Sequence, residues 1–179
     1  MARTVLNFAL FYGGWFACIY GMALHKPWLG PLVAVVVVGV HLALSGEQRL
    51  RELCTLLTAL LIGPLIDTAV AATRWLEFVE PLSFGFYAPP SEIALWAVFA
   101  TTLHSSLGWL TERPWMLAVG CAVSVPITYW IAAGLGAARV LEPVPALLSL
   151  GVLWAVGLPV IMRVSQRLHG MLGGARAGA

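Results

Sequence analysis

Six long apolar stretches divide the chain, and short polar or proline-containing segments separate most of them. Each stretch has the length that an α-helix needs to cross the hydrocarbon core of a bilayer, roughly 17–25 residues. None shows the alternation of polar and apolar residues that strands of a membrane β-barrel require. The pattern therefore predicts an all-α, polytopic membrane protein, a bundle of six transmembrane helices. The predicted spans are residues 4–24, 28–44, 53–72, 93–110, 114–134 and 144–162.

Composition supports this class and excludes others. Of the 179 residues, 60% are hydrophobic and 10% are charged, whereas soluble domains carry about 25% charged residues. A chain this apolar can be neither disordered nor an ordinary soluble domain. The cysteines, Cys18, Cys54 and Cys121, lie in apolar stretches, which favours a role as small hydrophobic side chains over disulfide or redox chemistry. The net charge of +2 is spread along the chain, so no nucleic-acid partner is expected.

The positions of lysine and arginine predict the orientation of the bundle, because cytoplasmic loops are enriched in these residues. With the N-terminus inside, seven basic residues fall on the cytoplasmic side and three on the opposite side. We therefore expect cytoplasmic termini, one transmembrane domain over residues 1–163 and a basic cytoplasmic tail over residues 164–179. The seven are Arg3, Arg49, Arg51, Arg113, Arg163, Arg167 and Arg176, and the three are Lys26, Arg74 and Arg139.

The one long connection, residues 73–92, mixes aromatic and acidic residues with helix-breaking proline and glycine. We expect a short interfacial helix over residues 74–79, followed by an apolar loop. Such a loop is either a strap in contact with lipid or a lid over a cavity of the bundle.

Asp67 is the only carboxylate well inside a predicted span. An ionisable side chain there costs about 2.5–3.5 kcal/mol on insertion scales, which makes it a candidate functional residue. Pro64 precedes it by three residues and is expected to kink the helix. An acid beside a kink can bind a cation, a proton or a polar headgroup. Alternatively, Asp67 is structural and is paired with Tyr129, Arg74 or Arg139.

A second polar group falls in the fourth predicted span, where Thr101, His104, Ser105 and Gly108 would share one helical face. This face should turn toward the bundle interior, where it either contacts a ligand and relays protons or serves as hydrogen-bonding glue between helices. His41 lies near the inner end of the second span, where its side chain can reach the headgroups. Helix rise separates Asp67 and His104 by about 10 Å in depth, so we expect no direct pair between them.

Other chemistry has little support in the sequence. No spacing of His, Asp or Glu is typical of a metal site, and no nucleophile motif is present, so no metal and no cofactor are predicted. Small residues recur at every fourth position in two spans and favour close helix packing, within the bundle or against a partner protein. They are Gly13, Ala17 and Gly21 in the first span, and Gly120, Ser124 and Thr128 in the fifth.

Several short motifs resemble one bacterial family, the inner-membrane proteins that share domain of unknown function 2878. They are Asn7-Phe8, Gly14-Trp15, Asp67, Trp96, the block from Phe99 to Leu107, Trp109-Leu110, Tyr129, Gly134 and Gly136-Ala137. The chain departs from the family at His104-Ser105, where the family has Asn-His. The resemblance implies a multi-pass protein of a bacterial inner membrane and gives weight to Asn7, Asp67 and His104. It implies no particular activity, because none is established for the family.

Three functions remain open. The first is binding of a lipid or small amphiphile in an intramembrane cavity, with or without its transport. The second is an intramembrane lipid-modifying enzyme that uses His104 or Asp67 for proton transfer. The third is a non-catalytic subunit that docks a membrane protein, or a second copy of itself, through its first helix. The candidate ligand-binding residues are Asp67, His104, Ser105, Thr101, Tyr129 and Asn7.

Overall fold

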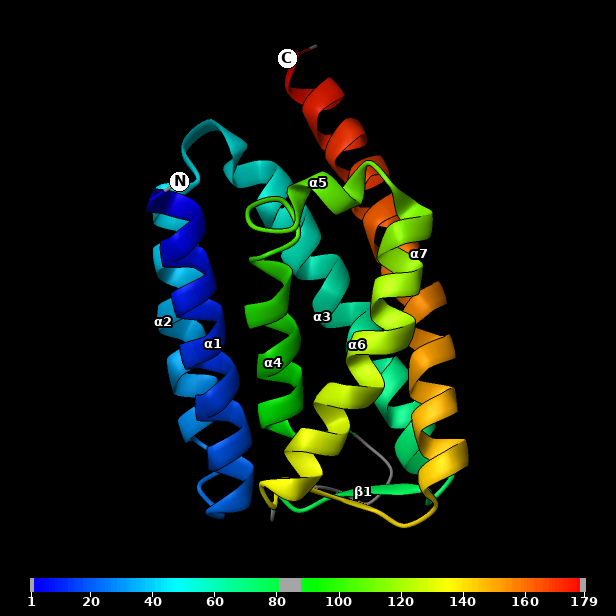
Figure 1. Cartoon of the computed structure of the whole chain (residues 1–179). Helices are drawn as coiled ribbons and strands as arrows, with labels where there is room; N and C mark the ends of the chain where they lie inside the picture. The colour runs from blue at the N-terminus through cyan, green and yellow to red at the C-terminus, as the bar shows by residue number, and fades with distance from the viewer. Residues whose placement is uncertain (1, 81–87, 178–179) are drawn as a thin grey trace.

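The computed structural model describes residues 2–80 and 88–177, which form a helical bundle with one small sheet. Its longer helices are α1 (Ala2–Ala23), α2 (Leu29–Leu44), α3 (Arg49–Ala72), α4 (Pro90–Ala100), α6 (Pro114–Gly134) and α7 (Pro143–Ala177). The shorter elements are η1 (Gly46–Gln48), α5 (Gly108–Thr111), β1 (Leu76–Phe78) and β2 (Ala138–Val140). Successive longer helices run in opposite directions, so α1 begins and α7 ends at the same end of the bundle (Figure 1). We call this the terminal end, and the opposite end, which carries β1 and β2, the sheet end.

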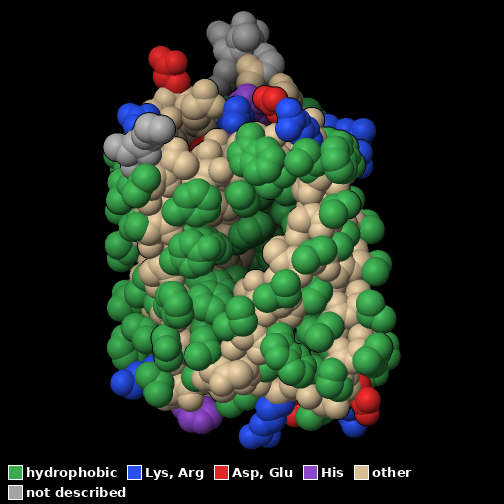
Figure 2. Space-filling view, viewed as in Figure 1, with side chains coloured by type: hydrophobic (Ala, Val, Ile, Leu, Met, Phe, Trp, Pro, Cys, Tyr) green, Lys and Arg blue, Asp and Glu red, His purple; other side chains and the backbone are tan. Residues whose placement is uncertain are grey.

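The sides of the bundle are apolar. Four helical segments are long and apolar enough to cross a membrane, Arg3–Ala23, Gly46–Ala72, Pro114–Gly134 and Pro143–Gly173, whereas α2 and α4 are apolar but shorter. Large apolar side chains cover the flanks, and charged side chains gather at the two ends (Figure 2). Val35, Leu61 and Val144 are 71%, 72% and 70% exposed. So large an exposed apolar surface fits a membrane protein.

The helix predicted over residues 93–110 is wrong in its second half. α4 ends at Ala100, and residues 101–107 form turns that lead into α5. The hydroxyl groups of Thr101 and Thr102 each donate a 2.7 Å hydrogen bond to the carbonyl oxygen three residues earlier. The backbone N–H groups of Thr101, Thr102 and Leu103 likewise donate to the carbonyl oxygen three residues earlier, so the i to i−4 bonding of an α-helix is not continued. The predicted helical face of Thr101, His104, Ser105 and Gly108 therefore does not form.

The helix predicted over residues 74–79 is also wrong, because this segment contains β1. Antiparallel pairing places Leu76 opposite Val140 and Glu77 opposite Arg139. Each strand has three residues and is stabilised by a partner far away in sequence, so neither carries a local pattern that predicts it. The rest of the predicted strap or lid, residues 81–87, lies outside the described residues.

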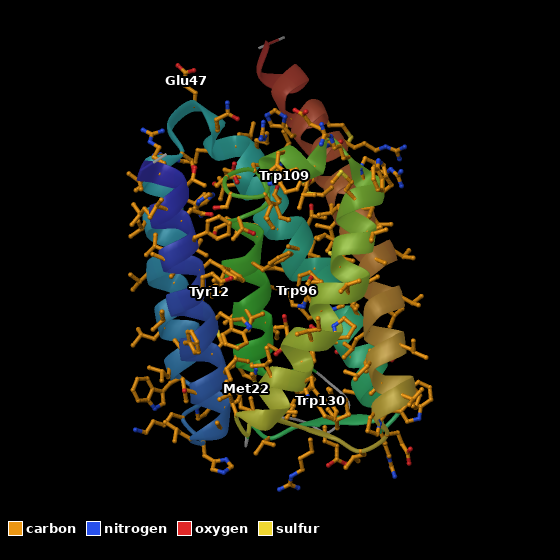
Figure 3. All side chains as sticks on the ribbon, in the orientation of Figure 1. Tyr12, Met22, Glu47, Trp96, Trp109 and Trp130 are labelled. Carbon is orange, nitrogen blue, oxygen red and sulfur yellow. The ribbon has the colours of Figure 1, made fainter. Side chains whose placement is uncertain are left out.

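Trp96 occupies the centre of the bundle (Figure 3). Its side chain is fully buried and stacks on Trp154 of α7, with ring centroids 4.0 Å apart. On the α3 side the ring lies against Gly63, where an added Cβ would overlap its carbon atoms. Helix α3 runs unbroken through Pro64, the next residue. Gly63 thus allows a full-sized indole between three helices.

The small residues of the predicted packing stripes have different surroundings. Gly21 lies against the start of α2, where a Cβ would be 3.3 Å from the backbone nitrogen of Gly30. A Cβ on Gly13 or Gly120 would meet nothing within 4 Å. Ala17 is half-buried, and Ser124 is exposed. Of these residues, Gly21 is therefore at a close approach between helices.

We predict that Gly63→Ala destabilises the protein, because the new methyl group must displace the Trp96 ring. Overpacking of this kind costs about 1–3 kcal/mol, which a lower thermal melting temperature in detergent would report. Gly39→Ala in α2 is the matched control, since a Cβ there meets nothing within 4 Å and alanine is the better helix former. Equal melting temperatures for the two variants would contradict this account.

Candidate functional site

Three buried side chains meet between α3, α4 and α6, and we call them the acid cluster: Asp67, Glu92 and Tyr129. The Tyr129 hydroxyl lies 2.6 Å from Oδ1 of Asp67 and 2.7 Å from Oε1 of Glu92. The indole nitrogen of Trp96 donates to the other oxygen of Asp67 at 2.5 Å. Asp67 is 0% exposed and Glu92 3% exposed. The pairing of Asp67 with Tyr129 that the sequence offered as the structural alternative is therefore present.

The acid cluster holds more acceptors than its hydroxyl can serve. A tyrosine hydroxyl has one proton to donate, yet a carboxyl oxygen lies within hydrogen-bonding distance on each of its two sides. Both contacts are favourable only if one carboxyl group carries a proton and donates it to the tyrosine oxygen. A cavity of about 20 Å³ beside Glu92 and Tyr129 has room for one water molecule. This arrangement is able to hold and exchange a proton.

Glu80 extends this acidic region toward the sheet end. Its Oε2 accepts a hydrogen bond of 3.1 Å from the backbone N–H of Ser91, in the first turn of α4. A carboxylate at this position complements the positive end of the helix dipole. Burial nevertheless raises the pKa of Glu80 above its usual value, and the bond from Ser91 opposes this effect. Glu80 is also close enough to Glu92 for their negative charges to repel.

A second polar group lies at the terminal end, around Glu52 in α3. Oε2 of Glu52 is 3.1 Å from Nε2 of His41 and 3.7 Å from Nδ1 of His104. The same Nδ1 is 3.4 Å from the Thr55 hydroxyl. The expectation that His41 simply reaches the headgroups is wrong, because His41 is buried against Glu52. As expected, His104 does not pair with Asp67.

Glu52, His41 and His104 line a cavity of about 430 Å³ between α1, α2, α3 and the turns after α4, which we call the histidine pocket. Asn7 holds one wall in place, because its amide donates to the carbonyl of Thr101 and accepts from the Ser106 hydroxyl. The polar lining residues are Arg3, Thr4, Asn7, His41, Ser45, Gln48, Arg51, Glu52, His104 and Ser105. Mixed polar and apolar walls make this cavity suited to an amphiphilic or charged group.

A third cavity, of about 500 Å³, is lined mainly by apolar and aromatic side chains of α1, α4, α6 and α7. We call it the lateral pocket. It lies on the face of the bundle shown in Figure 2, which is hollowed between these helices. Tyr129 reaches its inner wall, and Ser124 and Thr128 supply hydroxyl groups from α6. Its remaining lining residues are Phe11, Tyr12, Trp15, Phe16, Leu95, Phe99, Cys121, Val125, Ile131 and Trp154.

The structure thus separates the ligand-binding residues predicted from the sequence. Asp67 and Tyr129 belong to the acid cluster, whereas Asn7, His104 and Ser105 line the histidine pocket. Thr101 lines neither, because its hydroxyl bonds within α4 and only its carbonyl meets Asn7. Among the described residues, no group of three or more His, Cys, Asp or Glu side chains could hold a metal ion.

Two buried acids, Glu52 and Glu92, were not predicted as site residues, because in the sequence both fall in the connections between apolar stretches. Both lie in the first turn of a helix and are buried. Glu92 had a usable signal, since Pro89-Pro90 is typical of a helix start and places Glu92 inside the helix. Glu52 had none, because its partners come from α2 and from the turns after α4.

We predict that Tyr129→Phe lowers the melting temperature, because it leaves two buried carboxyl groups without the hydroxyl between them. Loss of such a buried partner costs about 1–3 kcal/mol. Tyr12→Phe removes the same atom from a side chain that is 55% exposed and should change little. Thermal unfolding in detergent compares the two, and equal effects would show that the hydroxyl of Tyr129 is dispensable.

Comparison with known proteins places the chain in a family. No curated protein and no solved structure matches it. The model of one family, described as protein of unknown function (DUF2878), matches residues 4–160. Residues 4–160 include both polar groups. They also include every residue that lines the three cavities except Arg3, which lines the histidine pocket. The match confirms the resemblance seen in the sequence, and the chain therefore belongs to the family of proteins of unknown function DUF2878.

Proposed function

We propose that this protein is a multi-pass protein of a bacterial inner membrane that binds a lipid or other small amphiphile, with the apolar chain in the lateral pocket. The observation that carries the proposal is the pocket itself. Its volume of about 500 Å³ falls within the range of about 300–1,000 Å³ for small-molecule sites. It opens on an apolar flank, so a molecule can enter sideways from the hydrocarbon.

The lining of the lateral pocket suits an acyl or similar chain. Aromatic rings of α1 and α4 form one side, and Trp154 of α7 contributes to the lining. The polar side chains of its lining are few, Ser124, Thr128 and Tyr129 of α6, and Tyr129 contributes a phenolic hydroxyl. Because that hydroxyl is engaged by Asp67 and Glu92, the pocket offers mainly dispersion contacts and apolar burial.

The binding proposal requires the bundle to cross the membrane, and we propose six crossings with both termini in the cytoplasm. Because the helix directions alternate, the start of α1 and the end of α7 lie at the same end of the bundle (Figure 1). Helix α4 is shorter than the other longer helices. The turns that follow it and the short helix α5 continue the chain to the terminal end. The excess of arginine at that end supports a cytoplasmic location.

Mass spectrometry of the gently extracted protein tests the binding proposal. We expect a lipid or other amphiphile to co-purify, and we expect Ser124→Trp to reduce it about tenfold, a change of about 1.4 kcal/mol, because the indole fills the pocket. Val123→Trp is the matched control, since Val123 is the neighbouring residue, is 60% exposed and does not line the pocket. Equal retention by the two variants, or no bound amphiphile, would overturn the proposal.

Cysteine labelling tests the topology. The native cysteines are buried, so single cysteines at Glu47, Glu77 and Glu112 can be read in intact cells with a membrane-impermeant maleimide. We expect Glu77→Cys, at the sheet end, to react from outside. Glu47→Cys and Glu112→Cys, at the terminal end, should react only after permeabilisation. Labelling of either one in intact cells would contradict the proposed arrangement.

A further inference from the structure

We propose that the histidine pocket is a binding site for a phosphate group, distinct from the lateral pocket and independent of the function proposed for it. The site lies at the terminal end, between α1, α2, α3 and the turns that follow α4. Four observations on the described residues support it: the cavity, its charge balance, an unpartnered cationic donor and a ring nitrogen of His104 that makes no hydrogen bond.

The charge of the lining favours an anion. Arg3 and Arg51 contribute two fixed positive charges, and Glu52 is the one acidic residue among the described lining residues. The carboxylate of Glu52 is engaged by His41 and His104. The arginines also disfavour a cation as the occupant, because they would repel it.

Arg51 carries the most direct sign of a missing partner. Its Nε atom is buried and makes no hydrogen bond with any described residue. A buried, unpaired donor on a charged group is costly. The guanidinium group fits phosphate oxygens closely, because it presents several N–H groups in one plane. A phosphate in the cavity would supply the acceptor that the protein does not.

Both His41 and His104 line the cavity. Nδ1 of His104 is turned toward Thr55 and Glu52, and within the described part of the chain Nε2 makes no hydrogen bond. Glu52 therefore acts as a positioning residue, because it orients both imidazole rings. A protonated histidine adds a further donor and a further positive charge.

The apolar part of the lining indicates how the phosphate is presented. Leu6, Leu10, Val37 and Leu44 form walls beside the charged groups. A phosphate carried by a lipid headgroup and a free phosphate share the chemistry that the arginines recognise. Phosphate monoesters carry the higher charge, so phosphatidic acid is the lipid probe of choice.

Binding to the purified full-length protein in detergent tests this site, with three probes: inorganic phosphate, short-chain phosphatidic acid and the matching diacylglycerol. We expect phosphatidic acid to bind, diacylglycerol to bind at least about tenfold more weakly, and affinity to fall with added salt. If inorganic phosphate binds in addition to phosphatidic acid, the site is assigned to free phosphates. If phosphatidic acid binds and inorganic phosphate does not, the site is assigned to lipid headgroups. Both results support the proposal.

Arginine variants locate the site. Arg51→Gln and Arg3→Gln should each weaken phosphatidic acid binding about tenfold. Arg49→Gln is the control, because Arg49 is exposed, donates to the carbonyl of Leu42 and does not line the pocket. Arg3 is exposed in the first turn of α1, so Arg3→Gln tests the site even if Arg51→Gln unfolds the protein.

Three results would overturn the proposal. The first is equal binding of diacylglycerol and phosphatidic acid, and the second is no binding of any phosphate probe. The third is an affinity for phosphatidic acid that is the same in Arg3→Gln and Arg49→Gln. Ser124→Trp, which fills the lateral pocket, should leave phosphate binding unchanged, so failure of the lipid proposal and failure of this one give different results.

Discussion

A buried carboxyl group inside this apolar bundle needs hydrogen-bond partners, which Asp67 finds on other helices, and the rest of the structure depends on this constraint. Neither packed side chains nor hydrocarbon can replace the hydrogen bonds of water. Asp67 of α3 is therefore held by Trp96 of α4 and Tyr129 of α6. Trp96 can reach it only because Gly63 leaves room for the indole ring. One buried carboxylate thus fixes the relative positions of three helices.

The same constraint has different outcomes at the two ends. In the acid cluster Asp67, Glu92 and Tyr129 satisfy one another when one carboxyl group carries a proton, and the cavity beside them holds no more than one water molecule. The histidine pocket is far larger and leaves a buried guanidinium nitrogen of Arg51 without a hydrogen-bond partner among the described residues. The acid cluster is closed and its hydrogen bonds are made within it, which suits a structural role and proton exchange. The histidine pocket is open and contains a hydrogen-bond donor without an acceptor among the described residues, which suits the binding of a ligand. This contrast, more than the residue types alone, separates the two sites.

Much of the fold was predictable from the sequence, because hydrophobic stretches report directly on helices in a membrane. Five of the predicted spans agree with α1, α2, α3, α6 and α7 in position, although not at every boundary. The fourth failed after Ala100, where Thr101 and Thr102 form local hydrogen bonds in place of a continued helix. The sheet was missed because three residues of β1 or β2 carry too short a pattern, and their stability comes from pairing with each other.

For the site, the sequence by itself determined which residues stand out: Asp67 and His104 are conspicuous because ionisable groups are costly in an apolar stretch. It also offered Tyr129 as a partner of Asp67. Only the tertiary structure decided that Glu52 joins His41 to His104 and that Glu92 joins Asp67 through Tyr129. Hydropathy is a property of neighbouring residues in the chain, whereas these contacts depend on how helices far apart in sequence pack against one another.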